Sequence, residues 1–329
     1  MAADHPWRPS TAVSYRSNVR GLTADATLAD TRVMSLTPRL VRAAFARWEA
    51  AGASQSVVGG RFRVLRSAVG WAYDKRVIDD HPLRSMRGPG RVEPRRPLTD
   101  GQVRALLSTA ESNALGAVAA SDSSWRGRQR RQGVEQDLLL VRLAADSGAR
   151  RGELSALRFD DLEGRLLRIE RSVSADQVGP TKSGQPRWLT VGTSTALLWR
   201  TLEADWRACA PAHQFGPWVF AADPAHSRRL TVSVLGHRFR RLRDQAGVPG
   251  GSLHRLRHSV ATFLVARGQI LQAQARLGHR DAATTLREYA YAVPLTDGDV
   301  ADAINDHLDF LPTGNDANVP GHGGPARPR

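Results

Sequence analysis

Two arginine-containing boxes place cations where a phosphate group could be held. Arg150 follows the glycine break at Ser147-Gly148 and stands near an expected helix start. A helix N-terminus favours anions, and a guanidinium there can donate a forked pair of hydrogen bonds to two phosphate oxygens. In the second box, LHRLRH at residues 253–258, His254 and Arg257 are three residues apart. That spacing puts both side chains on one face of a helix.

Three further side chains could supply an acid, a base or a nucleophile to such a site. Lys182 lies in the turn-rich segment 179–184, and His279 follows a glycine at the end of an expected helix. Tyr289 comes ten residues after His279, with Tyr291 two residues beyond it. Each of these residues alone would more often pack or face solvent, so the order and spacing of the whole set carry the interpretation.

Neighbouring residues exclude three other kinds of site. The pair before Lys182 is Pro-Thr, where a phosphate-binding P-loop requires glycine. Arg255 follows His254, where a zinc metalloprotease has glutamate. Pro249-Gly250-Gly251 lacks the preceding strand and the glycine spacing of a dinucleotide fingerprint. We therefore expect neither a metal nor an organic cofactor.

The charge balance predicts a polyanionic partner. The 329 residues contain 47 Lys and Arg against 32 Asp and Glu, a formal net charge of +15, and only Lys75 and Lys182 are lysines. An arginine-rich, GC-rich coding background would also explain the scarcity of lysine. Codon bias alone would not leave the acidic residues so far behind, so nucleic acid is the favoured partner.

Length and composition indicate a soluble chain from a reducing compartment. A hydrophobic fraction of 41% and a charged fraction of 24% are typical of globular proteins, and the length allows one large domain or two ordinary ones. The single cysteine, Cys209, excludes internal disulfides. No apolar run approaches the ~18 residues of a membrane span, and residues 1–10 lack a secretory signal. We expect a cytoplasmic protein without a membrane partner.

Residues 1–98 are expected to form a basic helical unit. They contain 17 Lys and Arg against 8 Asp and Glu. Thr37-Pro38 is a helix start, and the Pro- and Gly-rich stretch 86–97 is interpreted as a linker. Arginines beside an apolar face are usually only solvated, so they form a DNA surface only if other observations agree. An apolar stripe recurs at helical spacing in this unit: Val58, Phe62, Leu65, Val69 and Ala72.

The rest of the chain has the pattern of helices around a few short strands. A capping box at 99–102 opens a helix, residues 121–133 are interpreted as an exposed basic loop, and 134–158 as helical with a break at 147–148. Strands at 166–169 and 188–191 flank the segment that contains Lys182. Further helices are expected at about 194–208, 231–246, 252–267, 281–290 and 296–308.

Taken in order, these boxes resemble those of the tyrosine recombinase, or phage integrase, family. The resemblance covers roughly residues 10–295, including the helical N-terminal region. It rests on Gly-x-Arg-x-x-Glu-Leu at 148–154, Lys182 in a strand-connecting turn, Leu-His-x-Leu-Arg-His at 253–258, Leu-Gly-His at 277–279, and Tyr289.

The resemblance implies a mainly α fold with a small β-sheet, in the α+β class. A helical core DNA-binding domain would span 1–90 and a linker 91–98. A tyrosine-recombinase catalytic domain would span 99–311, and a disordered tail 312–329. The implied activity is site-specific strand exchange without a cofactor or a metal.

In that activity Tyr289 would attack a DNA phosphodiester to form a 3′-phosphotyrosine, and Lys182 would protonate the leaving 5′-oxygen. The pKa of arginine is too high for this proton transfer. A requirement for a general acid would therefore explain why this arginine-rich chain has a lysine at position 182. Tyr291 stands where relatives often have histidine, so it stays an alternative nucleophile.

The same resemblance assigns roles to the other polar side chains. Arg150 and Arg257 would hold the non-bridging phosphate oxygens, where charge builds up in the transition state. His254 would assist proton transfer, His279 would hydrogen-bond the phosphate, and Glu153 would orient its neighbours.

The implied partner is double-stranded DNA, bound by a homo-tetramer that spans two DNA sites and passes through a Holliday junction. An accessory DNA-bending or directionality protein would join it in some systems. The expected location is the cytoplasm, at the nucleoid. Two alternatives stay open: a catalytically silent DNA-binding accessory protein of the same fold, and a type IB topoisomerase-like enzyme. The presence of every expected catalytic residue argues against a silent protein. The two-domain layout and the His-x-x-Arg box argue against a topoisomerase.

Overall fold

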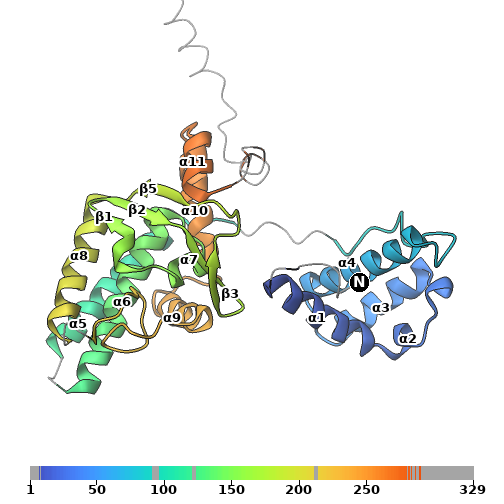
Figure 1. Ribbon diagram of the computed structural model, residues 1–329, viewed down its shortest axis with the longest axis horizontal. Helices are drawn as coiled ribbons and strands as arrows, with labels where there is room; N and C mark the ends of the chain where they lie inside the picture. Colours follow the sequence, from blue (N-terminus) through green and yellow to red (C-terminus); the bar gives the residue numbers. More distant parts are fainter. Residues whose placement is uncertain are drawn as a thin grey trace, which may run out of the picture.

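Two groups of helices, each with its own hydrophobic core, make up the described chain. The structure is a computed structural model that describes residues 7, 9–90, 96–120, 124–210, 214–279, 281, 283, 286 and 289. Buried apolar side chains between residues 28 and 86 form one core, and those between 98 and 256 form a larger one. Figure 1 shows the two groups, α1–α4 in blue and α5–α11 in green to orange.

The first group is helical, as the sequence predicts. Thr37 caps the third helix by accepting a hydrogen bond from the backbone of Leu40, with Pro38 in the first helical position. Four residues of the predicted stripe are buried on the fourth helix, and Leu65 is half-buried against them. The helices are α1 (Pro9–Thr23), α2 (Ala26–Ala29), α3 (Pro38–Ala50) and α4 (Gln55–Asp74).

The second group contains the remaining long helices. The predicted capping box is confirmed, because Thr99 accepts from the Gln102 backbone while the Gln102 side chain accepts from the Thr99 backbone. The helices expected near 194–208, 231–246 and 252–267 are also confirmed. The helices are α5 (Asp100–Ala119), α6 (Trp125–Ser147), α7 (Arg151–Ser155), α8 (Thr193–Ala208), α9 (Val232–Gln245), α10 (Leu253–Val265) and α11 (Ile270–Leu277).

The prediction of an exposed loop at 121–133 is wrong from residue 125 onward. Helix α6 begins there, and Ser124 caps it by accepting from the backbone of Gly127 at 3.0 Å. The inner face of this first part is formed by glycine and glutamine, and Gln132 is 6% exposed. Because these buried residues are not apolar, the segment shows no hydrophobic periodicity and is easily mistaken for a loop.

The strands form two small antiparallel sheets. The two predicted strands are β2 and β5. They pair with each other, and β1 pairs with the other edge of β2, in the order β1-β2-β5. An unpredicted hairpin, β3–β4, turns at Ala175-Asp176, where both residues have positive φ (48° and 64°). The strands are β1 (Leu162–Glu163), β2 (Leu166–Ile169), β3 (Arg171–Ser174), β4 (Gln177–Pro180) and β5 (Arg187–Thr190).

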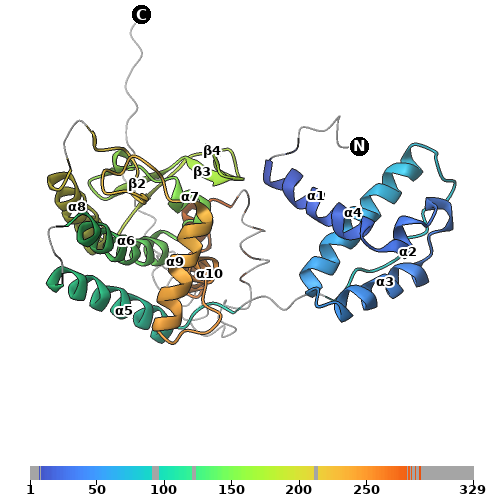
Figure 2. The ribbon, with the colours of Figure 1, turned by 90° about the horizontal axis from the view of Figure 1, so that it is seen from below.

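Helix α7 lies where the β3–β4 hairpin meets the helices of the second group. Figure 2 shows it between the β3–β4 hairpin and the pair α9 and α10, and residues of α7 approach both β3 and α9. The short α7 thus joins the β3–β4 hairpin to α9.

Several predicted segments fall at the edge of the described residues. Of the helix expected over 281–290, Ala283, Leu286 and Tyr289 are described and have helical backbone. The helix expected at 296–308 and the tail at 312–329 lie outside the described residues. Leu98, at the end of the expected linker, is buried and donates its N–H to Ser259 Oγ at 2.9 Å. In the part of the chain that the structure describes, no helix could cross a bilayer.

Candidate active site

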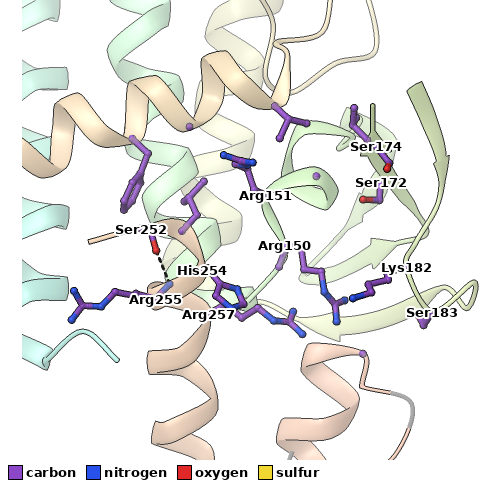
Figure 3. Close-up of a pocket in the computed structure, with 18 of the residues that line it drawn as sticks. Arg150, Arg151, Ser172, Ser174, Lys182, Ser183, Ser252, His254, Arg255 and Arg257 are labelled. Carbon is purple, nitrogen blue, oxygen red and sulfur yellow. Dashed lines mark hydrogen bonds between the residues drawn. The ribbon is translucent and has the colours of Figure 1, made fainter. Parts of the chain in front are cut away.

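A pocket of about 1780 Å³ lies where α7, the β3–β4 hairpin, α9 and α10 meet (Figure 3). Five of the six residues predicted for the site line it: Arg150, Lys182, His254, Arg257 and His279. Among the described residues that line the pocket, none is acidic. Such a lining favours an anion.

Arg150 enters the pocket from the turn between α6 and α7. Gly148 ends α6 in the left-handed conformation (φ 62°), and Arg150 is the residue that precedes α7. This is the glycine break that the sequence indicates. The Arg150 backbone donates to Glu153 Oε2 at 2.8 Å and its Nη1 to Glu153 Oε1 at 3.0 Å. Its side chain remains 28% exposed, so it can still contact a ligand.

Arg257 reaches the same place from α10 and is 2% exposed. Its Nη1 donates to the carbonyl of Gly148 and its Nη2 to the carbonyl of Leu277, each at 2.7 Å. Burial, and then the charge of Arg150, lower the pKa of Arg257 to about 9, which still leaves the guanidinium charged at neutral pH. Arg150 Nη1 approaches the same Leu277 carbonyl at 3.5 Å. One helix end therefore binds both arginines.

Glu153, buried on α7, is the anion at the centre of these cations. Its two oxygens accept from Nη1 and Nη2 of Arg187 at 3.2 and 2.7 Å, in addition to the Arg150 bonds. Burial acts to raise the pKa of Glu153, but the Arg187 hydrogen bonds and charge outweigh it and the pKa falls to about 2. The carboxylate is therefore ionised and accepts hydrogen bonds from both Arg150 and Arg187. Sequence reasoning missed Arg187, because one arginine at the start of a short strand carries no local signal.

His279 stands just beyond the C-terminus of α11, on the other side of the arginines. Gly278 ends the helix in the left-handed conformation (φ 65°), and the turn brings the next residue to the pocket. Burial, and then the charges of Arg257 and Arg150, lower the pKa of His279 to about 4. The ring is therefore neutral at pH 7 and can donate one hydrogen bond.

His254 lies one turn before a second histidine, which the sequence reasoning left without a role. The Nε2 atoms of His254 and His258 are 2.9 Å apart, with the ring planes nearly perpendicular. Burial, and then His254 and Arg257, lower the pKa of His258 to about 4. The two rings therefore share one hydrogen bond, and His258 connects His254 to Tyr289, whose ring centroid is 5.3 Å away.

Tyr289 is 1% exposed and does not line the pocket. It packs in a small core between α10 and α11, and its ring is stacked on His279 with centroids 6.5 Å apart. The phenol lies within electrostatic range of Arg257, because a negative charge on Tyr289 would raise the pKa of that guanidinium. The candidate nucleophile is therefore buried next to Arg257 and His279, on the side of these residues that faces away from the pocket. Tyr291 lies outside the described residues.

Lys182 occupies a turn between β4 and β5, as predicted. The Gly184 N–H donates to the carbonyl of Thr181 at 2.9 Å and closes the turn. Figure 3 shows the Lys182 side chain extending toward that of Arg150 on the same side of the pocket. An ammonium, two guanidiniums and two imidazoles thus surround one space, a set that can bind a phosphate diester and exchange protons with it. In the described part of the chain, no three His, Cys, Asp or Glu side chains could hold a metal ion.

Comparison with known proteins points to one family. The sequence profile of the phage integrase family matches residues 98–294. A tyrosine recombinase XerC of Mycobacterium sp. (strain KMS) is 28% identical over 261 residues, which cover 76% of this chain and 77% of that protein. XerC of Mycobacterium tuberculosis (strain ATCC 25177 / H37Ra) is 27% identical over 278 residues, covering 83% and 85%.

Solved structures share the fold. The Tn1549 transposon integrase in complex with transposon right end DNA has a TM-score of 0.70 at 18% identity, covering 92% of this chain and 95% of that one. A lambda integrase tetramer bound to a Holliday junction has a TM-score of 0.61 at 17% identity, covering 86% and 73%. The predicted fold class, mainly α with small antiparallel sheets, is confirmed.

Proposed function

This chain belongs to the phage integrase family, whose members are DNA strand-exchanging enzymes, and from that premise we propose that it is a site-specific recombinase with Tyr289 as nucleophile. One observation carries the assignment. Arg150 and Arg257 bind the same carbonyl of α11, and the residue stacked on Tyr289, His279, follows directly from that helix end. A phosphate held by the arginines would therefore lie beside the tyrosine.

Tyr289 is buried outside the pocket lining, so in the proposed reaction its side chain first moves into the pocket. The Tyr289 oxygen then attacks the scissile phosphorus, and its proton passes to the His254–His258 pair. A bond forms between phosphorus and the tyrosine oxygen, and the bond between phosphorus and the 5′-oxygen breaks. Lys182 gives its proton to that 5′-oxygen, which leaves as a hydroxyl. The phosphodiester energy stays in the 3′-phosphotyrosine, so a second 5′-hydroxyl can reverse the step without a cofactor.

Electrostatics explain why the phosphate would react here. Arg150 and Arg257 would face the two non-bridging oxygens with fixed guanidiniums, and neutral His279 would add a hydrogen bond. Carbonyl oxygens and the Glu153 carboxylate hold these groups before DNA arrives. Their positions therefore need little reorganisation when charge develops on the phosphate.

The proposed substrate is double-stranded DNA, held between the basic helical domain 1–90 and the catalytic domain 99–311, with 91–98 as linker. The exposed arginines of the first domain support its proposed contact with the DNA phosphates: Arg16, Arg20, Arg39, Arg42, Arg63 and Arg66. We propose a homo-tetramer on two sites that passes through a Holliday junction, with or without an accessory DNA-bending or directionality protein. Its place is the cytoplasm, at the nucleoid.

The experiment that tests this function lets the protein select its own DNA site. The protein is incubated without metal with sheared DNA of its source organism, and covalent adducts are isolated under denaturing conditions and sequenced. We expect one recurring sequence, called the captured site below. Binding without any adduct would instead indicate a silent DNA-binding protein. Relaxation of supercoiled DNA without exchange between two captured sites would indicate a topoisomerase.

A further inference from the structure

We propose that Arg187, on β5, is a positioning residue for strand transfer, which fixes Arg150 and His279 without touching the DNA itself. The inference rests on the proposed function. Arg187 and Glu153 are both absent from the lining of the pocket, and the Arg187 side chain is 9% exposed. It therefore acts from behind the site.

All three guanidinium nitrogens of Arg187 are used. Nη1 and Nη2 donate to the two oxygens of Glu153, at 3.2 and 2.7 Å, and Nε donates to the carbonyl of Arg276 at 2.9 Å. One side chain thus joins three elements that are distant in sequence: β5, α7 and the end of α11. A planar, forked donor is required for this geometry.

Both ends of this bridge lead to groups that would bind the phosphate. Glu153 holds Arg150 through its backbone and its Nη1. On the other side, Arg276 immediately precedes the carbonyl that binds Arg257, and His279 follows three residues after Arg276. A Cβ on Gly278 would stand 3.1 Å from Arg187 Nη1, so the guanidinium also packs directly against the turn that presents His279.

Removal of Arg187 would leave Glu153, among the described residues, with Arg150 as its one remaining guanidinium partner. A buried carboxylate keeps its charge only when it is paired. Arg150 already donates to Glu153 through Nη1 at 3.0 Å and is 28% exposed, so its guanidinium can move further onto the carboxylate. Arg150 would then be withdrawn from the phosphate. The expected consequence is slower cleavage with nearly unchanged DNA binding, because the many contacts outside the pocket are kept.

The test compares Arg187→Met and Arg187→Lys with a matched control, Arg238→Met. Arg238 on α9 also joins a carboxylate, Asp137 at 2.8 Å, to a backbone carbonyl, that of Gly133, but does not line the pocket. For each variant we would measure the unfolding midpoint in urea, the Kd for a duplex carrying the captured site, and the rate of single-turnover adduct formation on a nicked copy of that duplex. All rates are taken at urea-free conditions where every variant is folded.

We expect Arg187→Met to form the adduct roughly ten- to hundred-fold more slowly than the wild type, because a displacement of a catalytic group by up to about 1 Å has an effect of this size. Its Kd for the duplex should stay within about three-fold of the wild-type value. Arg187→Lys, which keeps the charge but loses the fork, should recover part of the rate. Arg238→Met should lose stability but not rate. If Arg187→Met cannot be purified folded, the rate of Arg187→Lys decides.

Equal rates for the wild type and the Arg187 variants would overturn the positioning role, and so would a loss of rate explained wholly by a weaker Kd. Neither result touches the proposed function, because the wild-type protein still forms the adduct. If the wild type forms none under the same conditions, the proposed function itself fails.

Discussion

Replacing Gly148 by alanine is expected to displace both arginines of the site. Gly148 has φ 62°, and its carbonyl accepts from Arg257 Nη1 at 2.7 Å. A Cβ there would stand 2.9 Å from Cδ2 of Leu277 and 3.4 Å from Cγ1 of Val260. Leu277 is fully buried, so its side chain cannot turn aside into open space. The backbone around residue 148 must therefore move, and Arg150 with it.

The magnitude has two parts, and a control separates them. The left-handed conformation costs alanine roughly 1–2 kcal/mol, and an extra methyl in a filled core typically costs a further ~1–3 kcal/mol. Gly268 also has positive φ (71°), but a Cβ there would meet no atom within 4 Å. Gly268→Ala should therefore lose about 1–2 kcal/mol of unfolding free energy, and Gly148→Ala about 2–5 kcal/mol.

The assay is urea unfolding together with single-turnover adduct formation on the nicked captured site. We expect Gly148→Ala to be the less stable of the two by about 1–3 kcal/mol and to cleave at least about ten-fold more slowly. Gly268→Ala should cleave at the wild-type rate. Equal losses of stability, or equal cleavage rates, would refute the argument that contact with Leu277 fixes the position of Gly148.

Three other predictions concern the pH dependence of stability, the role of Lys182 as general acid, and the salt dependence of DNA binding. Burial lowers the pKa of His226 to about 4 from 6.5. The unfolded chain therefore binds a proton that the folded protein does not, and stability should fall as the pH drops from about 6.5 to 4. His226 has φ 54°, which asparagine tolerates, so His226→Asn should flatten this part of the urea-unfolding profile. Lys182→Arg should bind DNA but cleave it poorly. A substrate with a 5′-thiolate leaving group, which needs no general acid, should restore the cleavage rate of this variant in a single-turnover assay. An unchanged slow rate with that substrate would count against Lys182 as the general acid. Binding to the captured site should weaken by about 10³-fold or more between 50 and 200 mM salt in a titration, whereas a flat response would argue against a basic clamp.

The parts of the site that could be predicted depend on local geometry. A glycine that must take positive φ, followed by arginine, marks the α6–α7 break, and His254 and Arg257 share a helix face by spacing alone. Their roles came from the resemblance to the tyrosine recombinase family, which rests on the order of the boxes along the chain. Such signals lie within one helix or one turn, so a single sequence is enough to find them.

The missed features depend on contacts between distant segments. Arg187 pairs with Glu153 across 34 residues, and no pattern around either residue indicates the other. The β3–β4 hairpin turns at Ala175-Asp176 instead of the Asn-Gly or Asp-Gly that usually supplies two positive φ angles. The first turns of α6 bury glycine and glutamine, so tertiary packing there replaces the apolar stripe that sequence reasoning requires.

The central claim, that Tyr289 is the nucleophile, is tested most directly by mapping the covalent adduct. The wild-type adduct on the captured site is digested with protease and nuclease, and mass spectrometry locates the nucleotide-bearing tyrosine. We predict the modification on Tyr289, with Tyr289→Phe binding DNA but forming no adduct and Tyr291→Phe forming it normally. An undiminished adduct in Tyr289→Phe, or a nucleotide on Tyr291, would contradict the account.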